Sequence, residues 1–265
     1  MPTNKLSTII SAYNQDELAC VHIRECQNST RIPDEIIIVD DCGEPGLKEK
    51  LEKLDIKTKI IYARILPPKI KWNYTGARNL GVWLSKGDYL SIEDNDHIPY
   101  KDFYKDALDA LKTNPKVSRI KTHKRRVVEL NDVLKKPIEE WKILGSRPPH
   151  QDVCVIKRDL YLKVKGYDER FAGAYGWSAT DWKRRLVRTG ILTINTSYQY
   201  VIASPKTRGL SYRNYQLART QQGNQSPKGI LNFTYIYEIL PPNSKDGRSI
   251  TNFPLQFPPK EGVPA

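Results

Sequence analysis

Short runs rich in β-branched residues alternate with longer segments of mixed apolar and polar residues through the first half of the chain. The short runs predict buried strands over residues 6–11, 35–39, 57–62 and 89–92. The longer segments predict helices over residues 15–27, 45–54, 74–84 and 101–111. Strands that alternate with helices indicate βαβ units, and therefore an α/β fold with a mostly parallel central sheet flanked by helices.

The pattern changes after Asn114-Pro115. A basic strand is predicted within residues 116–126, followed by a segment, 127–144, that is helical in part and broken at Pro137. Next come a strand over 152–157 and helices over 159–166 and 177–190, each ended by a glycine. Beyond Ser204 the chain is polar and basic, and residues 241–265, rich in Pro and Lys, predict an extended strap or tail.

Polar residues suited to binding follow three of the four strands predicted in the first half. They are Tyr13-Asn14 after the first, Asp40-Asp41 after the second, and Asp94-Asn95-Asp96 after the fourth. In open α/β sheets, ligands bind outside the carboxyl ends of the strands. The agreement predicts a binding site at that edge of the sheet.

Composition limits the classes of protein that fit. The 265 residues, 39% of them hydrophobic, suffice for one core with at most a small appendage. No apolar run approaches the roughly 18 residues of a membrane span, and the N-terminal segment lacks the apolar stretch of a signal peptide. The four cysteines show neither metal-binding spacing nor a disulfide framework. We therefore expect a cytoplasmic protein with reduced thiols.

The positive charge is unevenly placed. Lys and Arg number 43 against 30 Asp and Glu, which gives a net charge of +13, and residues 182–237 contain no acid at all. That segment carries Lys183, Arg184, Arg185, Arg188, Lys206, Arg208, Arg213, Arg219 and Lys228. Such a field attracts a nucleotide diphosphate, a nucleic acid or a lipid surface, although a solvated basic tail would have the same composition.

The strongest motif is the acidic turn in residues 91–99, directly after a predicted strand. Asp94 and Asp96, two positions apart, can share one hard divalent cation. Mg²⁺ and Mn²⁺ accept oxygen ligands and complete their coordination with waters and substrate phosphates. An isolated Asp-x-Asp is often only a solvated loop, but here Gly-Asp-Tyr-Leu precedes it and Ile-Pro follows it.

Four motifs together resemble the family 2 glycosyltransferases of the GT-A fold. The family pattern is P-x-Y-N after the first strand, V-D-D-x-S after the second, then A-R-N-x-G and G-x-Y-L-x-x-x-D-x-D. This chain has ISAYN at 10–14, VDDCG at 39–43, GARNLG at 76–81, and GDYL at 87–90 before DND at 94–96. Order and spacing match, and the resemblance covers about residues 6–200.

The resemblance implies an organisation and a set of roles. Residues 1–115 would form the nucleotide-sugar-binding half, 116–204 the acceptor-binding half of the same GT-A domain, and 205–265 a basic C-terminal extension and tail. Ser11, Tyr13 and Asn14 would line the base pocket, Asp40 or Asp41 would hydrogen-bond the base, Arg78 would face the nucleotide, and Asp94 and Asp96 would bind ribose and metal. The alternatives are a helix N-cap for one of Asp40 and Asp41, and a surface ion pair for Arg78. Trp72 and Trp83 are expected in the core.

The acceptor side departs from the family pattern. Residues 166–171 resemble the family's G-G-F-D-E-x-F, but the helix that reads W-x-x-E-D-x-D-x-x-x-R-L in relatives has Ser178-Ala179 in place of Glu-Asp. Asp181, Arg185 and Leu186 do align. Either Asp181 has taken over as catalytic base, or Ala179 replaces an original Asp and this version is impaired.

A phosphate clamp has to come from elsewhere in the chain. Some relatives use a C-terminal His as an extra metal ligand, but the only histidines are His22, His97, His123 and His150. His97 stands beside the metal motif and is either a ligand or a surface residue. Arg208, Arg213 and Arg219 are the candidates for holding the diphosphate.

The resemblance predicts an inverting, metal-dependent transfer from a nucleotide-diphosphate sugar to an acceptor hydroxyl, on a cell-surface or lipid-linked glycan. The charge of +13 keeps a nucleic-acid acceptor, such as a modified DNA base, as an alternative. A relative that binds a nucleotide sugar or glycan without turning it over is the third possibility. Retention of Asp94 and Asp96 argues against it, and Ala179 argues for it.

Overall fold

The structure is a computed structural model that describes residues 4–203, 210–220, 233–242 and 250–257. The described strands form one sheet in the order β11-β10-β3-β2-β1-β4-β8-β6-β9-β5, and β7 pairs with β6 beside this path. The sheet is mixed, because β8, β10, β11, β5 and β7 each run antiparallel to a neighbour.

The strands are β1 Leu6–Ala12, β2 Glu35–Asp40, β3 Lys59–Ile65, β4 Tyr89–Asp94, β5 His97–Pro99, β6 Val117–Val128, β7 Ile143–Arg147, β8 Cys154–Lys157, β9 Leu192–Ile202, β10 Phe233–Leu240 and β11 Ile250–Phe257. The helices are α1 Asp16–Gln27, α2 Leu47–Leu51, α3 Tyr74–Leu84, α4 Phe103–Thr113, α5 Leu130–Lys135, α6 Arg158–Lys163, α7 Ser178–Arg188 and α8 Tyr212–Thr220, with short 3₁₀ turns η1 Ile138–Glu140 and η2 Glu169–Phe171.

The four predicted strands of the first half form the parallel centre of the sheet, in the order β3-β2-β1-β4. Their side chains are almost all buried, as expected for strands covered on both faces. Within this parallel part, Ser11 of β1 stands opposite Asp94 of β4, and Ala12 stands opposite Asp40 of β2. The predicted site motifs therefore meet at one edge.

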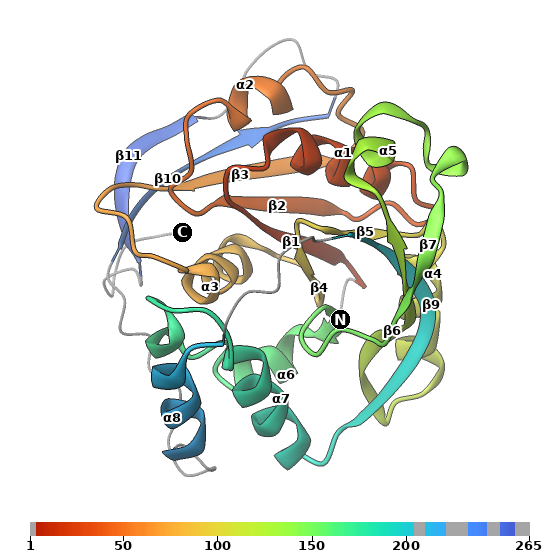
Figure 1. The fold of residues 1–265 in the computed structure, drawn as a ribbon, viewed down its shortest axis with the longest axis vertical. Coiled ribbons are helices and arrows are strands. Elements are labelled where there is room, and N and C mark those ends of the chain that lie inside the picture. The colour runs from red at the N-terminus through yellow and green to blue at the C-terminus, as the bar shows by residue number, and fades with distance from the viewer. Residues whose placement is uncertain (1–3, 204–209, 221–232, 243–249, 258–265) are drawn as a thin grey trace.

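Helices cover both faces of the sheet (Figure 1). On one face, α1, α2 and α4 pack against the strands through residues such as Ile23, Leu51 and Leu108. On the other face, α3, α6 and α7 pack through residues such as Leu80 and Trp182. A smaller apolar cluster lies under α1 and α5, between β5 and β9. The predicted α/β fold with helices on both faces is confirmed. The sheet is not mostly parallel as predicted, because six of the ten strand pairings among the described residues are antiparallel.

The second half returns along the sheet in antiparallel fashion. β8 pairs with β4 so that Cys154 stands opposite Ile92, and the same register carries Asp152 towards Asp94. The long strands β6 and β9 run parallel to each other, and β9 places Val201 opposite His97 in β5. The strand β5, which the sequence pattern did not predict, leads directly out of the acidic turn.

The end of the chain differs from the predicted strap. β10 pairs antiparallel with β3, with Tyr235 opposite Ile65, and β11 pairs with β10. Alternating side chains of β10 are buried, because this strand closes the edge that β3 would otherwise expose. The prolines of residues 241–265 had suggested a tail. Because proline is unfavourable in strands, the sequence pattern did not predict the strand Ile250–Phe257. No described helix is both long and apolar enough to cross a bilayer.

Two tryptophans expected in the core lie elsewhere. The Trp83 side chain is 46% exposed, which makes that expectation wrong. Trp83 falls on the outer side of α3, because Leu80 and Val82 already fill the side that faces the sheet. Trp72 is half-buried, with its ring 5.5 Å from that of Tyr175.

We expect Gly81→Ala to destabilise the fold by about 1–3 kcal/mol. A Cβ at this position of α3 would come within 2.5 Å of Cγ2 of Ile9, a fully buried residue of β1. The overlap outweighs the higher helix propensity of Ala, worth about 1 kcal/mol. Urea unfolding measures the change, with Gly145→Ala as control, since a Cβ there meets nothing within 4 Å. Equal effects of the two substitutions would refute the close packing of α3 on β1.

Candidate functional site

The turn after β2 separates the roles of its two aspartates. Asp40 accepts a hydrogen bond from the Gly43 N–H (2.8 Å) and another from the Tyr62 hydroxyl (3.2 Å), so it closes the turn. Asp41 is also buried, but its Oδ1 has no hydrogen-bond partner among the described residues. Asp41 is therefore the one of the pair with an acceptor to offer a ligand.

Burial raises the pKa of Asp41 to about 7; the Asn73 N–H opposes this effect, and the nearby Asp40 carboxylate adds to it. The fold keeps a carboxylate where its charge is disfavoured. Such perturbed groups are concentrated at functional sites.

Tyr13 and Asn14 follow β1 on the same edge. Asn14 has a left-handed backbone (φ 51°), and its side-chain oxygen accepts from the Glu44 N–H at 2.7 Å, which joins the two strand-end turns. Lys69 lies over the Tyr13 ring, with its Nζ 3.7 Å from the ring centroid. Sequence reasoning missed Lys69, because it belongs to the loop after β3 and to no motif. It brings a cation to the same edge as Asp41.

Arg78 is the buried centre of the site. Its side chain is 1% exposed and forms ion pairs with both Asp94 and Asp152. The Tyr74 and Tyr167 rings lie 5.2 and 5.0 Å from the guanidinium. Because Arg78 is buried, the alternative of a surface ion pair is excluded. Both ion-pair partners of its guanidinium are carboxylates of the protein itself.

His150 and Asp152 complete this group. The His150 Nδ1 is 2.5 Å from Asp152 Oδ1 and 3.9 Å from Asp94 Oδ2. Burial disfavours the Asp152 charge, but Arg78 and His150 outweigh it and hold the pKa of Asp152 well below its usual range. Asp152 is therefore an ionised carboxylate. The sequence predicted a strand that begins at Asp152, two residues after His150, without the antiparallel register that brings these residues to Asp94.

His97 holds Asp96 in place. Arg125 donates from Nη1 to His97 Nε2 at 2.9 Å, so that nitrogen is an acceptor. The opposite nitrogen, Nδ1, is then the N–H that donates to Asp96 Oδ1 at 2.8 Å. In this arrangement His97 orients a carboxylate and keeps no nitrogen free for a cation.

A buried polar network lies beneath the acidic turn. His22 bonds to Glu93 Oε2 at 2.7 Å and to the Asn95 carbonyl at 3.3 Å, and both side chains are inaccessible to solvent. Ser91 and Tyr104 donate to the other Glu93 oxygen. The three donors to Glu93 fix the backbone from which Asp94 and Asp96 project.

The first turn of α7 contacts α3 beside Arg78. The Ser178 hydroxyl contacts the Tyr74 hydroxyl. Asp181 points elsewhere: Arg185 donates to it from Nε at 2.9 Å and also bonds to the carbonyls of Val164 and Gly166. The aligned carboxylate is thus occupied, and Ala179, half-buried, offers no proton acceptor.

The three arginines predicted to hold the diphosphate do not gather at Asp94 in the described part of the chain. Arg208 lies outside the described residues. Arg213 donates to the carbonyls of Ala172 and Arg170, and Arg219 is exposed on α8. The diphosphate clamp remains a prediction.

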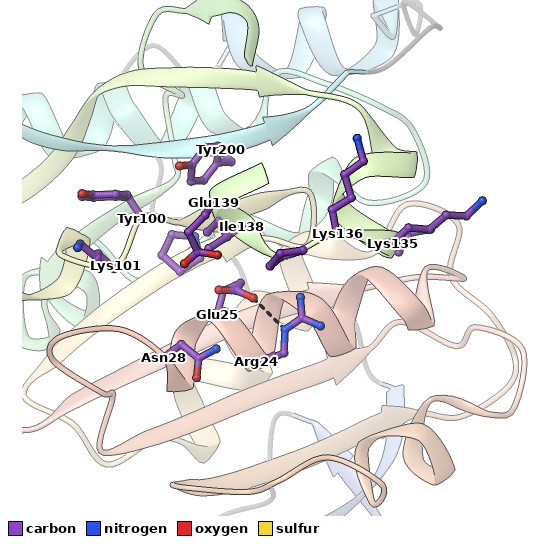
Figure 2. A pocket seen from close by; sticks show the side chains of 13 residues that line it. Arg24, Glu25, Asn28, Tyr100, Lys101, Lys135, Lys136, Ile138, Glu139 and Tyr200 are labelled. Atoms are coloured by element: carbon purple, nitrogen blue, oxygen red, sulfur yellow. Dashed lines mark hydrogen bonds and ion pairs between the residues drawn. The ribbon is translucent and has the colours of Figure 1, made fainter. Parts of the chain in front are cut away.

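A groove of about 740 Å³ lies away from these residues, between α1 and the α5–η1 segment (Figure 2). Arg24, Lys101, Lys135 and Lys136 line it together with Glu25 and Glu139. Glu25 pairs with Arg24, and Asp132 pairs with Lys136. The groove therefore carries little net charge, and it includes none of the predicted site residues.

Comparison with known proteins decides the family. The model of "Glycosyl transferase family 2" matches residues 7–157, the part that holds all the strand-end motifs. The chain belongs to glycosyl transferase family 2. A curated family relative, an uncharacterized glycosyltransferase of Haemophilus influenzae, is 23% identical over 171 residues, which is 61% of this chain and 55% of that protein. The chain thus spans about half the length of this relative.

Solved structures share the fold of this family 2 chain. S. aureus TarS 1-349 in complex with UDP-GlcNAc superposes with a TM-score of 0.63 at 15% identity, over 84% of this chain and 68% of that one. The mannosyltransferase PcManGT from Pyrobaculum calidifontis, in complex with GDP-Man and Mn²⁺, gives 0.55 at 16% identity, over 83% and 63%. The fold is GT-A, as the motifs predicted.

The residues of this family 2 site fit a divalent cation. Asp94, His150 and Asp152 can each offer a ligand atom, and these atoms lie within 4.8 Å of one another. Asp94 and Asp96 form a second such group with His97, but the ring nitrogens of His97 already bond to Asp96 and Arg125. His150 Nδ1 and Asp152 Oδ1 are buried and form an ion pair with each other at 2.5 Å. A mixed imidazole and carboxylate set suits Mn²⁺ better than Mg²⁺, which favours oxygen ligands alone.

We expect Asp41→Asn to stabilise the family 2 chain at high pH only. At pH below about 4, Asp41 is protonated in both the folded and the unfolded state, so the free energy of unfolding carries no penalty. The penalty develops between the unfolded value of about 4 and the folded pKa of about 7, and it is complete above that. At pH 8.5 the substitution should add about 2–4 kcal/mol to the free energy of unfolding.

Urea unfolding at pH 4 and pH 8.5 tests this, with Glu44→Gln as the control for an exposed acid on the same turn. A gain that is the same at both pH values would show that Asp41 is not held against its charge.

Proposed function

We propose that this protein transfers a sugar from a nucleotide-diphosphate sugar to an acceptor hydroxyl. The observation that carries the proposal is the cluster of ligand atoms on Asp94, His150 and Asp152 at the carboxyl edge of the parallel strands, where His150 Nδ1 lies 2.5 Å from Asp152 Oδ1 and 3.9 Å from Asp94 Oδ2. Family membership and the nucleotide sugars bound in the two similar solved structures support it.

Asp94 and Asp96 would hold the divalent cation, and His150 is the further ligand that the fold brings to Asp94. When bound, such a cation neutralises the charge that develops on the departing nucleoside diphosphate. Arg78 keeps the Asp94 carboxylate oriented, and His97 does the same for Asp96. Both aspartates are thus positioned before any ligand arrives.

The nucleoside would lie along the ends of β1 and β2, beside Ser11 and Tyr13. Asp41 would accept from an N–H of the base, and its raised pKa makes that bond valuable, because a donor relieves a disfavoured charge. Lys69 would lie near the phosphates. Its ammonium group would leave the Tyr13 ring and contact them.

The reaction proposed is a direct displacement with inversion. The acceptor oxygen bonds to the anomeric carbon, the bond from that carbon to the diphosphate oxygen breaks, and the acceptor proton leaves to a base. Position 179, next to Ser178 at the α7 terminus, is where relatives supply that carboxylate. Because Asp181 is bound by Arg185, we propose that this chain binds the donor but turns it over slowly.

The proposed acceptor is a cell-surface or lipid-linked glycan. Four free thiols, Cys20, Cys26, Cys42 and Cys154, are consistent with action in the cytoplasm. The alternative of a nucleic-acid acceptor keeps its support from the net charge of +13, and the alternative of a non-catalytic binder keeps its support from Ala179.

We expect Asp96→Ala to abolish metal-dependent donor binding with little change in fold, because this side chain is 41% exposed on a turn. Calorimetric titration with UDP- and GDP-sugars in the presence of Mn²⁺ measures the affinity. The control is Asp109→Ala, which removes an exposed acid from α4 that pairs with Lys105. Unchanged donor affinity in Asp96→Ala would mean that the metal is bound elsewhere.

We expect Ala179→Asp to raise turnover by about 100-fold, the lower end of what a general base contributes. Asp181→Asn, which keeps the shape and loses only the charge paired with Arg185, should change turnover by less than about threefold. Release of nucleoside diphosphate with and without acceptor measures both. No gain in the first variant together with collapse in the second would assign the base to Asp181.

A further inference from the structure

The outer faces of α7 and α8 form a basic surface that the transfer site does not use. On α7 the exposed positions are Lys183, Arg184, Val187 and Arg188, spaced so that they share one side of the helix. The opposite side, with Trp182 and Leu186, is buried in the core. On α8 the exposed positions include Tyr212, Tyr215 and Arg219. We call these seven residues the α7–α8 face.

The two helices are joined into one surface. Arg184 donates from Nη1 to the Ala218 carbonyl of α8 at 2.9 Å, and the Trp177 ring, just before α7, lies 4.9 Å from that of Tyr215. Figure 1 shows α7 and α8 projecting together from one end of the molecule, away from α2 and β11.

The cations of this face have no carboxylate partner among the residues that the structure describes. The acids that flank this face in sequence are all buried: Asp181 and Asp168 pair with arginines, Glu169 accepts from Asn79, and Glu238 pairs with Lys48. Within the described part of the chain, no carboxylate forms an ion pair with Lys183 or Arg188. The groove of Figure 2 differs, since there carboxylates neutralise half of the cations.

Large apolar side chains stand among these cations. Val187 is 64% exposed and Tyr212 is 71% exposed, and Leu210, just before α8, is 63% exposed. Exposed aliphatic side chains gain no favourable contact from the sugar-phosphate backbone of a nucleic acid. In the interface of a bilayer they lose contact with water, while the cations meet the headgroups and tyrosines lie at the boundary.

We propose that the α7–α8 face binds the surface of a membrane rich in anionic lipid. Each Lys or Arg close to such a surface strengthens partitioning by about fivefold, so this cluster and its apolar side chains supply the two signals that stable binding needs. The binding is peripheral, along the plane of the headgroups.

The α7–α8 face lies close enough to the transfer site for membrane binding to bring a lipid-linked acceptor to it. Ser178, at the start of α7, contacts Tyr74 beside Arg78, and Arg188 lies ten residues further along the same helix. Ten residues of α-helix span about 15 Å. A sugar carried on a lipid headgroup would be within reach of the site; this last step rests on the proposed function, whereas the membrane binding does not.

The experiment is sedimentation of the full chain with vesicles of equal parts phosphatidylglycerol and phosphatidylcholine, beside vesicles of phosphatidylcholine alone. We expect binding to the anionic vesicles only, weakening as salt is added. Lys183→Glu with Arg188→Glu should reduce partitioning by at least about 20-fold, and Val187→Ser by a few-fold. The matched control, Lys101→Glu with Lys135→Glu, makes the same change of charge at the groove and should cost less than about fivefold.

Hydrogen exchange of the unmodified chain gives a second readout, with protection expected over Ser178–Arg188 and Tyr212–Thr220 when anionic vesicles are added. The proposal is overturned if the anionic vesicles do not bind, if both double variants lose binding equally, or if a single-stranded oligonucleotide binds more tightly through the same residues. Donor binding in solution is measured separately, so its failure would count against the transferase proposal and not against this one.

Discussion

The site depends on one buried guanidinium. Arg78, from α3, forms ion pairs with Asp94 at the end of β4 and with Asp152 just before β8, so it ties three elements of the fold at one point. A buried charge is tolerated only when its partners satisfy it, and removing either partner leaves a costly unpaired ion. The tyrosine rings beside Arg78 exclude water and strengthen both pairs. The position of Asp94 is therefore decided by the packing of the core.

The same turn is held from the other face of the sheet. His22 reaches from α1 to Glu93 and to the Asn95 carbonyl, so the residues on either side of Asp94 are anchored while Asp94 itself is held by Arg78. Alternation along β4 makes this possible, because Glu93 and Asp94 point to opposite faces. Carboxylates that are fixed in advance lose less conformational entropy when a charged ligand binds.

Local motifs predicted the parallel strands and the turns that follow them. They did not predict which strands distant in sequence pair with one another. Asp94 and Asp96 could be identified because a buried strand and an acidic turn are adjacent in sequence. Asp152 and His150 could not, since their place depends on the antiparallel register of β8 against β4. Arg125 reaches His97 only because β6 and β5 both pair with β9. Asp181 aligned with the family, but the sequence did not show that Arg185 would bind it.

The closing of the sheet by β10 has a consequence for how the protein is made. A ribosome delivers β10 long after β3, yet these two strands are hydrogen-bonded neighbours. Until Phe233–Leu240 has emerged, β3 presents an unpaired, apolar edge, the kind of surface on which nascent chains associate. The edge of the parallel strands is thus covered only once Phe233–Leu240 has paired with β3.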